Sequence, residues 1–248
     1  MILSNYDWIE EHDDETEPFV DFRKKVCDKY NISNDNARNI YPLLKNCELV
    51  TYEKGGNIRY SIFFTATGKA YAKTLDSIRS LEKRDVVTAK DKAAIGEFEK
   101  IKQQIILKGL KHLIEPNKTN YSNELRFFIE YTHRYGKINK YEFAYMLHML
   151  QQNNTGSILE EMNDVVKGYR HNNVDIEVSV NVRNDIEVRE KSNKSRRNEG
   201  ISFLTSYSYF SGLLEQAGLI KRTRAKDSYA IVLEGAEEKF EELLGGQS

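Results

Sequence analysis

The chain has 248 residues, of which 40% are hydrophobic and 30% charged, with only three prolines and two cysteines. This balance excludes a disordered chain and is typical of a helix-rich protein of two or three domains. Apolar runs are too short to span a bilayer, and the acidic N-terminus is unlike a signal peptide. We therefore expect a cytoplasmic protein with no membrane partner, in which Cys27 and Cys47 are reduced core residues.

The formal net charge is −1, but the charges are unevenly distributed. Acidic residues gather near the N-terminus and again over 237–242, whereas basic residues gather in two segments, Arg189–Arg197 and Lys221–Lys226. Phosphate contacts are local, because charges are screened over roughly 8–10 Å at physiological salt. Each basic segment is therefore a candidate phosphate contact, and a solvated surface is the alternative.

Apolar spacing predicts a helix over 19–30, with Pro18 suited to its first turn. Ser33 is expected to cap a second helix that runs through Leu44. Pro42 lies inside that segment and should kink or divide it, because proline cannot donate a helical hydrogen bond.

A β-hairpin is predicted next, with strands Leu49–Tyr52 and Ile58–Phe64 on either side of a glycine-rich turn. A helix should follow from Gly68 to about Leu81. The charged stretch 82–91 fits either a loop or an exposed helix. Residues 97–114 have helical periodicity that ends before a proline.

Two further helices are expected on either side of Gly136, the first marked by Leu125–Thr132. Asn139 and Glu142 have the spacing of a capping box for the second. A last helix in this region, Ile158–Arg170, completes a helical middle part of the chain.

Apolar residues then alternate from Val174 to Val182, which predicts a strand and a hairpin that returns through Ile186 and Val188. The basic stretch 191–200 is expected to be mobile without a partner. A helix is predicted from Phe203 to Ala217, and Gly218 should end it.

One pattern occurs twice: a helix ending in a leucine pair, a stop, a short strand, a polar turn and a second strand. The leucine pairs are Leu43-Leu44 and Leu213-Leu214. This order is the layout of a winged helix, which usually docks on duplex DNA. We therefore predict a mainly α fold with small β-hairpins (α+β), in which a helical linker joins two winged-helix subdomains. The expected boundaries are 1–81 for the first subdomain, 82–173 for the linker, and 174–248 for the basic arm and second subdomain.

Catalytic motifs are weak in this chain. A PD-(D/E)XK nuclease needs an acid-any-Lys triplet on a strand, so that carboxylates hold Mg²⁺ while lysine orients water. The triplet Glu237-Glu238-Lys239 is expected on a helix, and Asp185 and Glu187 precede an arginine instead. The five histidines lack paired-ligand spacing, and P-loop, dinucleotide-type GxGxxG and GxSxG motifs are absent from the sequence. We expect no catalytic site and no metal site in this chain.

Several segments resemble one family when taken in order. Phe64–Lys69 looks like the exit of a first winged helix, Gly136–Ala144 like a linker, and Lys194–Tyr209 like the entry and body of a second winged helix. In this order they resemble the N-terminal DNA-recognition half of type IIS restriction and nicking endonucleases, from about Phe19 to Leu244. In that family a Mg²⁺-dependent nuclease domain follows, and here the chain ends where that domain would begin. The resemblance implies a recognition module without its nuclease domain, which needs no cofactor itself and partners a nuclease domain or subunit.

We therefore expect a monomer that recognises double-stranded DNA in a sequence-specific manner. One alternative is a dimeric winged-helix transcription regulator that uses the middle helices as its interface, and another is a winged-helix protein-interaction scaffold. The candidate DNA-binding residues are polar or basic and lie on the two recognition helices, their hairpins and the basic arm: Asn34, Asn36, Arg38, Asn39, Lys54, Arg59, Lys69, Arg189, Lys191, Lys194, Arg196, Arg197, Ser206, Tyr207, Tyr209, Lys221, Arg222, Arg224 and Lys226.

Overall fold

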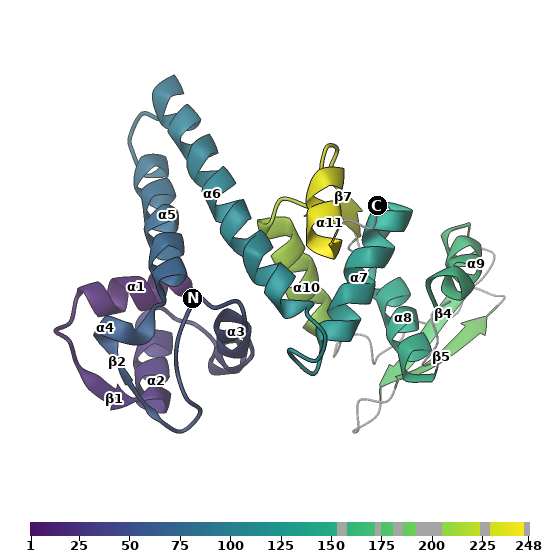
Figure 1. Cartoon of the computed structure of the whole chain (residues 1–248), viewed down its shortest axis with the longest axis horizontal. Coiled ribbons are helices and arrows are strands. Elements are labelled where there is room, and N and C mark those ends of the chain that lie inside the picture. The colour runs from purple at the N-terminus through teal and green to yellow at the C-terminus, as the bar shows by residue number, and fades with distance from the viewer. Residues whose placement is uncertain (153–157, 172–174, 181–185, 192–204, 224–228, 246–248) are drawn as a thin grey trace. The chain divides into compact units, whose positions relative to one another are not determined.

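The computed structural model describes residues 1–152, 158–171, 175–180, 186–191, 205–223 and 229–245 (Figure 1). The fold is mainly helical with small antiparallel strand pairs, which confirms the predicted α+β class at this level. The chain separates into two compact units, Met1–Leu113 and Ile114–Ser248. The finer three-part division stays a prediction. Within the described residues, no helix is long and apolar enough to cross a membrane.

The first unit contains six α-helices and two strands in its described chain. Their order is α1 (Ile2–Glu10), β1 (Thr16–Pro18), α2 (Phe19–Lys29), α3 (Asn34–Asn46), β2 (Asn57–Arg59), α4 (Tyr60–Phe63), α5 (Ala66–Glu82) and α6 (Ala89–Leu113). The predicted helices over 19–30, 34–44, 68–81 and 97–114 are confirmed, and α6 begins earlier than expected. Residues 83–88 form the connection between α5 and α6, which lie side by side (Figure 1).

Helix α1 was not predicted, because the acidic residues after it dominate the N-terminal segment. It packs on α5, and the carboxylate of Asp7 accepts hydrogen bonds from both terminal nitrogens of Arg79, at 2.6 and 2.8 Å. The Asn5 side chain is fully buried beside α3, where its Oδ1 accepts a hydrogen bond from the Tyr41 hydroxyl at 2.7 Å. These contacts make the N-terminal segment part of the fold of this unit.

Helix α3 begins as predicted, because the Ser33 hydroxyl accepts a hydrogen bond from the backbone N–H of Asn36. Pro42 lies inside α3, which continues to Asn46, so the expected alternative that it divides the segment is wrong. A proline removes only one helical hydrogen bond, to the carbonyl four residues earlier. Pro42 is exposed, while its neighbour Tyr41 and Ala37 are buried and fix α3 on the core.

The first hairpin was predicted wrongly. Strand β2 pairs with β1 instead, in the register Thr16 to Arg59, and Val50 meets only Phe64 in a single bridge. Residues 60–63 form the helical turn α4. Tyr60 and Phe63 both pack on Phe22, with ring centroids 5.6 and 5.0 Å away. A strand would point residues three apart to opposite faces, whereas a helical turn puts both rings into one core.

The second unit contains five helices and five strands in its described chain. They are α7 (Ser122–Tyr135), β3 (Lys137–Ile138), α8 (Lys140–Gln152), α9 (Ile158–Arg170), β4 (Asp175–Val180), β5 (Ile186–Lys191), α10 (Thr205–Gln216), β6 (Ile220–Arg222), β7 (Ala230–Val232) and α11 (Glu237–Leu244). The predicted hairpins are confirmed as β4–β5 and β6–β7, and the stops at Gly136 and Gly218 have positive φ. Phe128, Phe143, Tyr207 and Phe210 gather in the core.

Strand β3 was not predicted, and it completes a sheet in the order β3-β7-β6. Two residues carry no periodic signal in a sequence, so this strand is visible only through its pairing with β7. Its position between α7 and α8 corresponds to that of β1 between α1 and α2. The two units therefore share the order helix, strand, helix, helix and a later strand that pairs with the first strand. In the second unit, α9, β4 and β5 are inserted after α8.

The shared order extends to individual backbone hydrogen bonds. The N–H of Leu49 reaches the carbonyl of Leu44, and that of Leu219 reaches Leu214, each after a residue with positive φ, Glu48 or Gly218. The carbonyls of Leu49 and Leu219 then accept hydrogen bonds from the backbone N–H groups of Thr65 and Leu233, at 3.2 and 3.0 Å. We call these matched parts the first repeat (from α1 to Thr65) and the second repeat (α7, β3, α8, α10, β6, β7 and Leu233).

The repeats differ by one insertion. In the second, the strand β7 pairs with β3 at Ile231 and with β6 at the adjoining Val232. In the first, the equivalent pairings fall on Arg59 and Phe64, with the four residues of α4 between them. Helix α4 is thus a single turn inserted into a strand that is continuous in the second repeat.

Candidate nucleic-acid interface

The outward face of α3 carries most of the candidate residues of the first repeat. Asn36, Arg38 and Asn39 are exposed, and Arg38 reaches Asp35 one turn earlier at 3.5 Å. Asn34 lies half-buried, and its Oδ1 is shielded from solvent. Three of the four predicted polar residues of α3 are therefore open to a ligand.

The basic candidates outside α3 are exposed, and two have intramolecular partners. Lys54 lies in the turn before β2. Arg59 forms an ion pair with Asp14 at 2.7 Å, and Lys69 donates to the Ser61 carbonyl at 3.1 Å. The backbone N–H of Ser61, and then the Arg59 guanidinium, lower the pKa of the Asp14 carboxyl. Arg59 must leave or share this carboxylate before it can contact a phosphate.

In the second repeat, the candidate residues of α10 divide between core and surface. Tyr207 is buried, and its hydroxyl donates to the carbonyl of Ile138 at 3.1 Å, which makes it a packing residue unavailable to a surface ligand. Ser206 and Tyr209 are half-buried, and Ser208, which the sequence did not single out, is exposed. The helical spacing of buried Tyr207, Phe210 and neighbouring residues was the signal that could have assigned these faces.

The basic candidates of the second unit are only partly described. Lys221 and Arg222 lie exposed on β6. Arg189 and Lys191 lie on β5. Most of the stretch that was expected to be mobile lies outside the described residues. Five basic candidates lie outside them as well: Lys194, Arg196, Arg197, Arg224 and Lys226.

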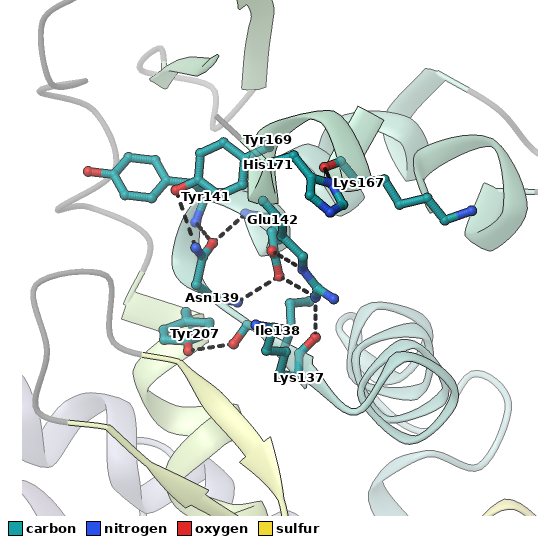
Figure 2. A network of polar contacts seen from close by, with 10 residues as sticks. Lys137, Ile138, Asn139, Tyr141, Glu142, Lys167, Tyr169, His171 and Tyr207 are labelled. Carbon is teal, nitrogen blue, oxygen red and sulfur yellow. Dashed lines mark hydrogen bonds and ion pairs between the residues drawn. The ribbon is translucent and has the colours of Figure 1, made fainter. Parts of the chain in front are cut away.

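A polar network holds β3, the start of α8 and the end of α9 together (Figure 2). The capping box is confirmed: Glu142 Oε2 accepts from the Asn139 N–H at 3.0 Å, and Asn139 Oδ1 accepts from the Glu142 N–H at 2.9 Å. Arg170 Nε donates to Glu142 Oε1 at 2.7 Å, and Arg170 also reaches the Lys137 carbonyl. Because Tyr207 of α10 bonds to Ile138 in the same strand, this network sets the position of α10.

In each repeat, a side chain of the third helix contacts a residue in the chain that follows the helix. In the second, Glu215 of α10 pairs with the Arg222 guanidinium, and its other oxygen accepts the Arg222 N–H at 3.1 Å. Burial opposes ionisation of Glu215, but these hydrogen bonds lower its pKa overall. At the matched positions of the first, the Lys45 ammonium lies over the Tyr52 ring, 5.3 Å from its centroid. Arg222 therefore holds β6 to α10 through Glu215. Because its guanidinium is already paired, Arg222 is a weaker candidate for a phosphate contact.

Within the described residues, no group of three histidine, cysteine, aspartate or glutamate side chains could hold a metal ion. The triplet Glu237-Glu238-Lys239 lies on α11, as expected. Cys27 and Cys47 are buried free thiols, and burial raises the pKa of Cys47 to about 12.

Comparison with models of protein families, with curated proteins and with solved structures finds no match to this chain. Its function is therefore inferred from its own residues and contacts.

Proposed function

We propose that this chain is a double-stranded DNA recognition module built from two winged helices. The observation that carries the proposal is the matched order and register of the two repeats. In each, a strand between the first and second helices belongs to the same small sheet region as the chain that follows the third helix. A helix-turn-helix unit of this kind places its recognition helix in the major groove. The recognition helices are then α3 and α10, and the turns after them are the wings.

The polar chemistry of the exposed surfaces supports the same function. Asparagine and arginine on α3 can pair with base edges, whereas lysines such as Lys54 and Lys221 can neutralise phosphates. We propose that the basic segments Arg189–Arg197 and Lys221–Lys226 contribute to affinity. Because phosphate contacts release counterions, this affinity should fall steeply as salt rises.

We further propose that the module serves a restriction or nicking endonuclease whose nuclease activity lies in a domain or subunit outside residues 1–248. This step rests on the ordered resemblance of Phe64–Lys69, Gly136–Ala144 and Lys194–Tyr209 to the recognition half of type IIS enzymes. Mg²⁺ would belong to that nuclease part. The protein itself should leave supercoiled plasmid intact in the presence of Mg²⁺, and reproducible cleavage would overturn the assignment.

The test of DNA recognition is a binding titration with a pool of random-sequence duplexes, followed by selection of the tightest binders. We expect salt-dependent retention of duplex and enrichment of one short, non-palindromic motif. Light scattering should find a monomer on that motif. Failure to retain duplex at low salt would contradict the proposal and favour a protein-interaction scaffold.

A dimeric winged-helix regulator is the second candidate. Two large apolar side chains exposed on the first unit favour it. Ile101 on the long helix α6 is 43% exposed, and Val86 in the turn before α6 is 75% exposed. Two copies that paired through this region would bury both side chains. A dimer in solution and a selected motif with two symmetric half-sites would support this candidate over the monomeric module.

A further inference from the structure

The outward face of α3 presents four different chemistries. Asp35, Arg38, Asn39 and Pro42 are spaced by three, four and seven residues from the first, so they share one face, and all four are exposed. In a major groove a carboxylate accepts from cytosine, an arginine donates to guanine, an asparagine pairs with adenine, and an apolar group contacts the thymine methyl. Within the described chain, the Asn39 side chain has no hydrogen-bond partner to give up.

Asp35 indicates what this face is suited to contact. Its side chain is 88% exposed, and Arg38, its partner at 3.5 Å, is 64% exposed. A phosphate offers only acceptor oxygens and negative charge, so a carboxylate on this face repels a DNA backbone. A cytosine amino group, in contrast, can donate to it. The face of α3 therefore suits base edges better than phosphates.

The matched face of α10 has a different chemistry. Ser208, Tyr209 and Gly212 occupy the positions of Arg38, Asn39 and Pro42 when the repeats are aligned on their leucine pairs. Hydroxyl groups bond to phosphates and to several bases without a fixed preference. Gly212 has no side chain, so a backbone can approach the helix closely there.

We propose that α3 supplies most of the base discrimination and that α10, with Lys221, clamps the sugar–phosphate backbone. This division of labour rests on the proposed function as a DNA recognition module. It makes the two repeats unequal, although their backbones match. Asp35, Asn39 and Pro42 then become specificity residues together with Arg38.

The test compares alanine variants at matched positions on the selected motif and on random duplex. Arg38→Ala and Asn39→Ala should each lower the ratio of the two affinities by roughly 5- to 150-fold, the range for loss of one bidentate base contact at about 1.4 kcal/mol per tenfold. Ser208→Ala should weaken both complexes equally. Lys221→Ala should do the same and reduce the slope of log affinity against log salt by about 0.9.

Asp35→Asn should change the affinity for random duplex in the opposite direction. Removal of the carboxylate should tighten binding to random duplex, because a repulsion is lost, while the preference for the selected motif falls. Lys92→Ala, which removes an exposed charge of α6, is the matched control and should change neither quantity. Melting temperatures of all variants should stay close to that of the wild type, since each side chain lies at the surface.

The outcomes separate the two levels of inference. A wild-type protein that retains no duplex overturns the DNA-recognition function itself. Two results overturn only the division of labour. In the first, the protein binds duplex and its sequence preference survives Arg38→Ala and Asn39→Ala. In the second, the sequence preference is lost in Ser208→Ala.

Discussion

Replacing Glu142 with alanine should destabilise the second unit strongly. Its carboxylate is fully buried and accepts hydrogen bonds from the Asn139 N–H and from two nitrogens of Arg170. The substitution removes the capping box of α8. It also leaves the guanidinium of Arg170, whose side chain is 18% exposed, without its counter-charge and bonded to the Lys137 carbonyl. A buried charge without its counter-charge is the main cost.

The magnitude follows from these contacts. Removing one partner of a buried ion pair costs about 3–5 kcal/mol. Loss of the cap contributes to the same total, since a cap is worth about 1 kcal/mol. We therefore expect a loss of about 4 kcal/mol in the free energy of unfolding. Changing Arg170 to methionine in addition should recover part of this loss, because the unpaired charge is then gone.

Urea unfolding followed by far-ultraviolet circular dichroism measures these losses. Glu160→Ala is the matched control, since Glu160 pairs with Arg134 at 3.0 Å on the surface, with side chains 67% and 53% exposed. It should cost less than about 1 kcal/mol. A loss from Glu142→Ala as small as that of Glu160→Ala, or no recovery in the double variant, would refute the assignment of this network as the support of α8 and β3.

Three other predictions concern the first unit. Gly68→Ala should lower the melting temperature, because a Cβ there would lie 1.7 Å from a backbone carbonyl oxygen, whereas Gly96→Ala, with open space around it, should raise stability by about 1 kcal/mol. Hydrogen bonding to Arg79 lowers the pKa of Asp7, so this pair stabilises the fold above the ordinary aspartate pKa and the benefit is lost as pH falls through the lowered value. Asp7→Asn should therefore reduce the melting temperature at neutral pH, and the difference in melting temperature from the wild type should shrink as the pH falls below the ordinary aspartate pKa. The Cys47 thiol, whose pKa is raised to about 12 by burial, should react with Ellman's reagent only after unfolding.

Elements with a long periodic signal were predictable from the sequence. Helices such as α2, α7 and α9 follow from apolar spacing, and the capping box at Asn139 and Glu142 follows from residue type and distance along the chain. Strands β1 and β3 were not predictable, because two or three residues have no period and are defined by partners far along the chain. The helical turn α4 was missed because its aromatic residues also favour a strand.

The candidate site shows the same limits at the level of single side chains. Asn36, Arg38 and Asn39 were found from their residue types, and all three are exposed. Tyrosine suits both a core and a surface, so the sequence offered Tyr207 as a contact residue although it packs inside. Asp35 was not among the residues predicted from the sequence. Its helical spacing from Arg38, Asn39 and Pro42 was the signal that could have placed it on the same face.

The insertion of α4 bears on the unequal roles proposed for the two repeats. In the second repeat, β7 is hydrogen-bonded on both edges, to β3 and β6, so β6 belongs to a continuous three-stranded sheet. In the first, β2 pairs with β1 alone, and Arg59 at its end is held by Asp14. A clamp on phosphates needs a supported strand that carries basic side chains, as β6 does with Lys221.

Reading of bases needs a helix that is firmly held on the core. Helix α3 has buried Ala37 and Tyr41 on one side and an exposed polar face on the other. The difference between the two sheets thus favours the same assignment as the difference between the two helix faces, although the two observations come from separate parts of each repeat.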